Sequence, residues 1–445
     1  MADNVSMDSA ISPARSLPTL TDMRWLRFAT FAVFYIAQGF PIGLFSLAMP
    51  AWMLQSGMSA AQVASFAFIS SLPWTFKLVA APLMDRYSFL PMGRRRPWIL
   101  AAQTCVTLSA AMLLTIADPA QQLTLLTAVA FAINAFCATQ DVAVDGMAID
   151  ILPAQEQGRA NSFMMGGQVL GYALSGALSA TLLAHGGVPL AGAALVGMVL
   201  LVTIASLLFR ERPGERLLPW TEGASTVRTD LPPTLAWKLI IGNLLRVTLV
   251  PMSILLVLVE FLYRSSAGVG VLLYPTVGVK LLGHNAEQFS WFASASTASA
   301  AILGLLIGLL VDRAGAVQML RITLLLSAAI FCTTGALHAY WSTPGFAPAA
   351  MLVIDLAGQS VMVSMIALFM SVCNRAVAAT QFAVYMAIAN LGRSSGNAAF
   401  PTLERFLETH QVFYAMGAVV LAAAALMTLF DSRRMLTSDG GPSPG

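Results

Sequence analysis

The sequence contains little charge. Only 10% of its 445 residues are Asp, Glu, Lys or Arg, whereas an average soluble protein carries about 25% charged residues. Because 58% of the residues are hydrophobic, a soluble fold of this length would lack the polar side chains needed to cover its surface. The composition therefore argues against a water-soluble enzyme and predicts a protein that crosses a membrane several times.

Residues that support metal, redox or nucleotide chemistry are also scarce. The four cysteines are Cys105, Cys137, Cys332 and Cys373. They lie in apolar stretches without a Cys-x-x-Cys spacing, which is typical of core residues rather than of a disulfide or metal site. The four histidines, all in expected loops, are His185, His284, His338 and His410. A GxxxxGK[ST] phosphate loop is absent. We therefore expect no cofactor, no metal site, no enzymatic centre and no ATP-driven pump.

Positive charge is small and dispersed. The net charge is +3 and no long basic tract occurs, so we expect no nucleic-acid partner. The first 20 residues are polar and lack the apolar core of a secretory signal. We expect residues 1–26 and 431–445 to form tails at the two ends of the chain.

Twelve segments are apolar enough to cross a bilayer, for which about 20 residues are needed. They are 27–52, 60–83, 97–117, 123–150, 160–184, 187–209, 250–279, 288–311, 318–337, 346–373, 378–402 and 410–430. The longest polar stretch divides them six and six. This pattern predicts an all-α membrane protein with two six-helix bundles, over 27–209 and 250–430. Between them, 210–249 forms a central loop in which 236–249 is a candidate interfacial helix.

Lysine and arginine are distributed unevenly between the two sides of these spans. Nineteen of the 24 fall on the side of the two termini, two fall on the other side, and three fall inside spans. Since cytoplasmic loops carry an excess of Lys and Arg, we expect both termini and the central loop in the cytoplasm.

A short motif occurs twice, at the cytoplasmic end of the second helix of each predicted bundle. Residues 81–86 read APLMDR, residues 308–313 read GLLVDR, and the first copy continues into the sequence GRRR at 93–96. This arrangement resembles the Major Facilitator Superfamily. Carboxylates and guanidinium groups at helix ends can pair with neighbouring termini, so we expect a cytoplasmic gate, although the arginines could also serve as ordinary membrane anchors. The gate candidates are Asp85, Arg86, Gly93, Arg94, Arg95, Arg96, Asp150, Asp312 and Arg313.

Longer segments resemble one branch of that superfamily. Residues 76–98, 140–158 and 373–393 are similar, in order and spacing, to the AmpG-type muropeptide permeases and the related acetyl-CoA transporters. The resemblance implies inward transport. It also implies a substrate among those of the branch, which are anhydromuropeptides, acetyl-CoA and siderophores.

Seven charged residues lie inside the predicted spans and away from the span ends, where a charge is costly unless it faces a cavity or a partner. They are Lys77, Asp141, Asp145, Glu260, Arg264, Asp355 and Arg393. Asp141 and Asp145 are four residues apart and therefore share one face of a helix. Repulsion between neighbouring carboxylates favours protonation of one of them, as a proton-coupled carrier requires. We expect one of the two to bind the proton, or alternatively both to be neutralised by Lys77 or Arg86.

The remaining intramembrane charges and two neutral residues are candidates for substrate binding. The full set is Tyr35, Gln38, Lys77, Glu260, Arg264, Asp355 and Arg393. Lys77 would attract an anion or control the acidic pair, and Arg393 suits a carboxylate or a phosphate. Glu260 and Arg264 have the favourable i,i+4 spacing and either neutralise each other or face the cavity.

Glycine and proline predict local deformation in two spans. The first span contains Gly39, Pro41 and Gly43, which predict flexing or a packing kink. The seventh contains glycines within 265–270 followed by Pro275, which predict a bend or unwinding of the kind common near transport sites.

Together these features predict a proton-coupled secondary transporter that imports an anionic or zwitterionic solute. The leading candidate is a peptidoglycan-derived muropeptide, and a siderophore is the alternative. A drug efflux carrier and a non-transporting assembly factor on the same fold stay open. The expected partners are the small-molecule substrate, protons and the lipid bilayer, with the chain acting as a monomer.

Overall fold

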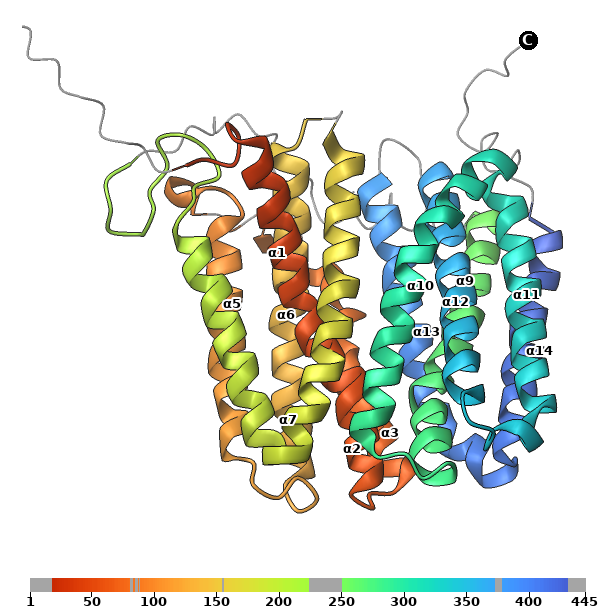
Figure 1. Cartoon of the computed structure of the whole chain (residues 1–445). Helices are drawn as coiled ribbons and strands as arrows, with labels where there is room; N and C mark the ends of the chain where they lie inside the picture. The colour runs from red at the N-terminus through yellow and green to blue at the C-terminus, as the bar shows by residue number, and fades with distance from the viewer. Residues whose placement is uncertain are drawn as a thin grey trace, which may run out of the picture.

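Two helical bundles stand side by side in the computed structural model of the protein (Figure 1). It describes residues 18–80, 83–84, 87, 89–153, 156–223, 250–372 and 378–430. Within these residues the chain forms helices, turns and an isolated β-bridge between Thr19 and Arg210, but no β-strand. Three predicted parts fall wholly or partly outside the described residues. They are the candidate interfacial helix 236–249, residues 1–17 of the expected tail 1–26, and the expected tail 431–445.

The helices follow the predicted order along the chain. The first bundle contains α1 (Arg24–Gly43), α2 (Met49–Gln55), α3 (Ala60–Ser71), α5 (Arg96–Ala111), α6 (Leu123–Ile151) and α7 (Gln157–Leu207). The second bundle contains α9 (Pro251–Pro275), α10 (Ala286–Ala314), α11 (Ala316–Ala336), α12 (Phe346–Val372), α13 (Ala378–Phe406) and α14 (Thr409–Thr428).

Eight helices in the described part of the chain are long and apolar enough to cross a membrane. The long helix α7 contains two predicted spans, 160–184 and 187–209. They are separated by Gly187, whose φ of +62° interrupts the helix and lets the chain turn back (Figure 1). With this division, each predicted span except the second, 60–83, corresponds to a helical segment of the described chain, and the protein is a multi-pass membrane protein.

The chain enters and leaves the two bundles at the same face. Helix α1 begins and α14 ends at the top of Figure 1, where the segment 208–223 also lies. We call this side the terminal face. The opposite face contains the ends of α2 and the turn at Gly187.

Glycines bring two pairs of helices into very close contact, one pair in each bundle. In the first bundle, a Cβ atom at Gly171 of α7 would lie 2.2 Å from the carbonyl oxygen of Ile36 in α1. In the second, a Cβ atom at Gly396 of α13 would lie 2.0 Å from the carbonyl oxygen of Ser265 in α9. Small residues allow such backbone approach in membrane helices, where packing drives association. The two bundles therefore share one packing device, as their repeated motif suggests.

Methyl groups at these contacts should separate the helices. We expect Gly171→Ala and Gly396→Ala each to lower stability by about 1–3 kcal/mol, as overpacking does in well-packed interiors. Gly197→Ala is the matched control because nothing lies within 4 Å of a Cβ atom there. Thermal unfolding of the purified protein in detergent measures the difference, and equal melting temperatures for all three variants would contradict it.

The first helix of each bundle contains a proline followed by a π-helical turn. In α1, Pro41 precedes the π-turn Leu44–Ala48, and in α9, Pro275 precedes the π-turn Thr276–Leu281. Proline cannot donate a helical hydrogen bond, so widening the next turn re-pairs the backbone. The deformation expected near Pro275 is therefore confirmed. At 265–270 no unwinding is observed, because α9 is helical throughout this stretch, and Gly268 packs against α13.

The second predicted span is not one continuous helix, contrary to the expectation for 60–83. Helix α3 ends at Ser71, and two 3₁₀ turns follow, Leu72–Trp74 and Lys77–Val79. Pro73 lies at the start of the first turn and lacks the amide hydrogen that an α-helix needs there. Because α3 starts at the opposite face and rises 1.5 Å per residue, this break lies near the middle of the membrane.

The two bundles touch in the half of the molecule near the opposite face. The amide of Ala286 donates to Gln55, and the hydroxyl of Thr181 donates to Glu287 at 2.6 Å. The indole of Trp291 donates to the same threonine at 3.2 Å. These contacts join α2 and α7 to the start of α10.

Candidate functional site

A buried ion pair lies beside the break in the second span. The ammonium nitrogen of Lys77 is 2.8 Å from Oδ2 of Asp141 on α6. Their side chains are 16% and 5% exposed, so the pair is largely withdrawn from solvent. The break in the helix places Lys77 on the 3₁₀ turn Lys77–Val79 facing α6. Lys77 and Arg86 were the cations expected to neutralise the acidic pair. In the described structure, Lys77 pairs with Asp141.

Asp145 lies one helical turn beyond Asp141, as their spacing predicts. The hydroxyl of Tyr35 on α1 donates a short hydrogen bond to Oδ1 of Asp145. The charges of Asp141 and Lys77 act on Asp145 as well. Thus α1, α6 and the broken span bring together a lysine, a tyrosine and two carboxylates, and Asp145 is the carboxylate bonded to a neutral group.

Two buried glutamines, Gln38 and Gln140, lie close in sequence to members of this cluster. Gln38 of α1 is 1% exposed and accepts a 3.5 Å hydrogen bond from Gln168. Within the described residues, the Nε2 atoms of Gln38 and Gln140 have no hydrogen-bond partner. Buried polar atoms are normally paired with protein, water or a ligand, so these two donors are exceptions within the described residues.

The second bundle holds a separate group of charges. Nε of Arg264 lies 2.9 Å from Oε1 of Glu260 on the same face of α9. On α12, Oδ2 of Asp355 accepts hydrogen bonds from Ser296 at 2.6 Å and Thr297 at 3.2 Å. The i,i+4 pair is therefore formed as its spacing predicts, and Asp355 is held by hydroxyl groups of α10.

Arg393 lies on α13 where that helix presses against α9. A Cβ atom at Gly268 of α9 would lie 2.1 Å from the Arg393 carbonyl oxygen. Its guanidinium interacts electrostatically with Arg264 and with Tyr172 of α7. Among the described residues, Arg393 forms no hydrogen bond or ion pair. Arg393 is thus a cation near the junction of the bundles that keeps its donors free.

Tyr172 extends from the first bundle to the charges of the second and was not predicted from the sequence. It belongs to α7 of the first bundle, yet it interacts electrostatically with Arg393 and Asp355 of the second. A tyrosine in a glycine-rich apolar helix is typical of a residue that packs in the core, so nothing in the sequence pattern indicated a functional role. A hydroxyl group in a glycine-rich helix is the feature that could have identified it.

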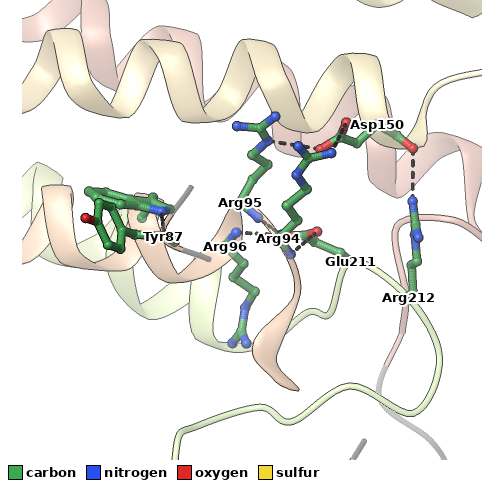
Figure 2. A network of polar contacts seen from close by, with 8 residues as sticks. Tyr87, Arg94, Arg95, Arg96, Asp150, Glu211 and Arg212 are labelled. Atoms are coloured by element: carbon green, nitrogen blue, oxygen red, sulfur yellow. Dashed lines mark hydrogen bonds and ion pairs between the residues drawn. The ribbon is translucent and has the colours of Figure 1, made fainter. Parts of the chain in front are cut away.

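The gate candidates near the terminal face form a network with Asp150. Nε of Arg95 lies 2.9 Å from Oδ2 of Asp150, and Arg94 lies 3.7 Å from Oδ1. Arg212 donates to the Asp150 carbonyl oxygen at 3.1 Å. Figure 2 shows the three arginines converging on Asp150 from two sides. These partners all belong to the first bundle or to the segment that follows it.

Glu211 fixes the start of α5 to this network. It accepts hydrogen bonds from the backbone amides of Arg94, Arg95 and Arg96 at 3.1, 2.9 and 2.5 Å. A carboxylate at a helix N-terminus satisfies amides that lack helical partners. Gly93 precedes them with φ of +100°, and a Cβ atom there would meet the Glu211 carboxyl group at 2.7 Å. Glu211 was not predicted, because an acid in a polar loop normally faces solvent.

Some gate candidates cannot be placed. Asp85 and Arg86 fall outside the described residues, as does Cys373 in the third matching segment. Asp312 belongs to α10, but its side chain is not among those described. Arg313 lies in the last turn of α10 and is exposed.

Two buried acids near the terminal face predict a pH dependence of stability. Burial and the charge of Glu211 raise the pKa of Glu215 to about 7, from an ordinary value of 4.5. A raised pKa in the folded state gives stability that is complete below the ordinary pKa and is lost as pH rises through the folded one. We expect the free energy of unfolding to fall by about 1–3 kcal/mol between pH 5 and 8, and the melting temperature to fall with it.

Glu215→Gln should flatten this profile, because glutamine stays neutral at every pH. Glu222→Gln, at an exposed position of the same segment, serves as the control and should keep the wild-type slope. Melting curves recorded from pH 5 to 8 provide the measurement. An unchanged slope in Glu215→Gln would contradict the assignment.

A small apolar cavity of about 50 Å³ lies in the second bundle. Its lining includes Phe289, Trp341 and Phe413, and none of its lining residues is Asp, Glu, Lys or Arg. It contains none of the predicted site residues and does not suit a charged solute. The described residues also include no group of three or more His, Cys, Asp or Glu that could hold a metal ion.

Comparison with known proteins identifies relatives along nearly the whole chain. The sequence profile of the Major Facilitator Superfamily matches residues 31–401. The anhydromuropeptide permease of Escherichia coli K12 is 29% identical over 426 residues, which cover 92% of this chain and 80% of the permease.

Solved transporter structures share the fold. The inward-open xylose transporter XylE of E. coli superimposes with a TM-score of 0.68 at 13% identity, covering 93% of this chain and 99% of XylE. A D-xylose-proton symporter gives a TM-score of 0.66 at 14% identity, with 90% and 97% covered. At these identities the similarity concerns the fold alone.

Proposed function

Because the chain belongs to the Major Facilitator Superfamily and is a secondary transporter rather than an enzyme, we propose that it imports anhydromuropeptides together with protons. The observation that carries this proposal is the buried cluster of Lys77, Asp141, Asp145 and Tyr35. Charges inside a membrane span are expensive and are kept where they bind or relay ions.

Asp145 is the proposed proton site, and Asp141 is the partner that holds Lys77 in place. Asp141 is compensated by a cation at 2.8 Å, whereas Asp145 is bonded to the neutral hydroxyl of Tyr35. A carboxylate without a cation of its own, one turn from another carboxylate, changes protonation most readily of the two. This distinction favours Asp145 in the choice that the sequence left open.

The substrate class follows from the relative and from the chemistry of the unpaired groups. The similar permease of E. coli is named for anhydromuropeptides, which combine sugar and peptide and therefore carry amides, hydroxyls and carboxylates. Arg393 suits bidentate binding of a carboxylate. The free amide donors of Gln38 and Gln140 suit carbonyl and hydroxyl oxygens, and the Glu260–Arg264 pair suits the zwitterionic peptide.

The proposed setting is the bacterial inner membrane, with the terminal face in the cytoplasm. The excess of Lys and Arg on that side supports this orientation. The network around Asp150 then lies at the cytoplasmic end and keeps the first bundle rigid while the bundles rock, with Asp312 and Arg313 at the equivalent place in the second. Both groups of charges come from one chain, so a monomer is sufficient for transport.

Uptake into proteoliposomes tests the proposal. Purified protein is reconstituted, a pH gradient is imposed with the outside acidic, and radiolabelled anhydromuropeptide, a siderophore and acetyl-CoA are compared. We expect accumulation of the anhydromuropeptide alone, and its loss when a protonophore dissipates the gradient. Accumulation of the siderophore or acetyl-CoA instead, or uptake that ignores the gradient, would overturn the proposal.

A further inference from the structure

We propose that Asn390 is a positioning residue that couples the two bundles by holding the broken part of the second span in place. The inference rests on the proposed proton-driven function and names an element that links its two groups of charges. Nδ2 of Asn390 on α13 donates a hydrogen bond of 3.1 Å to the carbonyl oxygen of Trp74. Trp74 ends the 3₁₀ turn that follows α3, three residues before Lys77.

The same face of α13 makes a second contact with the broken span. The hydroxyl of Ser394 lies 2.8 Å from that of Ser71, the last residue of α3. Asn390 and Ser394 are four residues apart and therefore neighbours on the helix surface. Both contacts cross from the second bundle to the first, and they fall on either side of Pro73.

Trp74 is also hydrogen-bonded within the first bundle, to α6. Nε1 of Trp74 donates to Oδ1 of Asn134 on α6 at 2.8 Å, and Nδ2 of Asn134 donates to the carbonyl oxygen of Ala130 at 2.9 Å. Asn134 is two helical turns before Asp141 on the same helix face. Trp74 is therefore held between α6 by its side chain and α13 by its backbone.

This arrangement connects the proton site to Arg393 of the second bundle. Lys77 follows Trp74 by three residues and bonds Asp141. Arg393 follows Asn390 by three residues on α13. A displacement of α13 against the first bundle breaks the bond to Trp74 and releases the segment that presents Lys77 to Asp141. Both a substrate at Arg393 and a proton in the acidic cluster then bias the same two-state contact, which is the physical requirement for coupling.

Asn390→Ala tests the inference, with Ser395→Ala as the matched control. The hydroxyl of Ser395 bonds the Leu391 carbonyl oxygen of its own helix at 2.8 Å, so its loss leaves the broken span untouched. Two assays in proteoliposomes use radiolabelled anhydromuropeptide. One measures accumulation driven by a pH gradient, and the other measures exchange against unlabelled anhydromuropeptide at equal pH.

We expect Asn390→Ala to accumulate about 10-fold less substrate than wild type while exchange stays within about 2-fold, since one hydrogen bond corresponds to a change of this order. Trp74→Phe removes the bond to Asn134 and should show the same split. The double variant should lose no more than the single variants, because both changes release the same segment around Trp74. Asn390→Gln, with an amide on a longer side chain, should recover part of the accumulation.

Three results would overturn the inference. Accumulation by Asn390→Ala equal to wild type would show that the contact is dispensable. A proportional loss of exchange and accumulation would show a merely structural role. Additive losses in the double variant would show two independent contacts. Failure of the proposed function appears separately, as wild-type protein that does not accumulate anhydromuropeptide in a pH gradient.

Discussion

Asp145→Asn should abolish accumulation of substrate against its gradient while leaving exchange intact. Asparagine resembles a protonated carboxyl group in shape but cannot take up or release a proton. A pH gradient of two units provides about 2.7 kcal/mol for each proton, which corresponds to about 100-fold accumulation. The variant should therefore reduce the ratio of internal to external anhydromuropeptide from that level to about one.

Uptake with and without a pH gradient measures the effect. Asp118→Asn, at an exposed position in the turn before α6, is the matched control and should accumulate substrate as wild type does. Exchange at equal pH shows whether the variant still binds and changes conformation. If Asp145→Asn accumulated substrate to the wild-type level, Asp145 would not be the proton site.

Lys77→Met should eliminate transport and destabilise the protein. The substitution leaves the buried carboxylate of Asp141 without the cation that lies at 2.8 Å. Breaking a buried pair by removing one partner typically costs about 3–5 kcal/mol, because an uncompensated charge stays in a poorly polar environment. We expect a clear drop in melting temperature together with loss of proton-driven accumulation.

The double variant Lys77→Met, Asp141→Asn separates stability from function. Removal of both charges should recover most of the lost stability, since a neutral pair has no desolvation penalty, but accumulation should stay absent. Lys280→Met, at an exposed position of the second bundle, should change neither property. A Lys77→Met protein with wild-type melting temperature and accumulation would contradict the role of the ion pair.

Span positions and intramembrane charges were largely predictable from the sequence. The length of an apolar run matches the thickness of the bilayer, so the spans can be located directly. A charge inside such a run is rare and therefore easy to identify. The i,i+4 rule was sufficient for Glu260 and Arg264, which lie on one helix. It also placed Asp141 and Asp145 on adjacent turns of α6.

Contacts between helices were not predictable. Lys77 lies next to Asp141 because the second span breaks after Ser71, and proline alone does not tell whether a helix bends or breaks. Glu211 lies in a polar segment where acids normally face water, yet it binds three successive backbone amides. Trp74 and Asn390 meet through a backbone carbonyl group, which leaves no trace in the pattern of side chains.

In the proposed proton site, two carboxylates that look equivalent in sequence have different partners. Asp141 compensates Lys77, and Asp145 bonds the hydroxyl of Tyr35. Arg393 in the other bundle keeps its donors free among the described residues. A carrier built this way couples a change of charge in one bundle to the binding of an anion at the other.

The central claim, that Asp145 carries the proton that moves with the substrate, is tested most directly by proton movement itself. Weakly buffered proteoliposomes are placed in a solution containing a pH-sensitive dye, and anhydromuropeptide is added outside. Wild-type protein should raise the external pH as protons enter with the substrate, and Asp145→Asn should exchange substrate without any pH change. Substrate entry by wild type at constant external pH, or an equal pH rise in the variant, would contradict the claim.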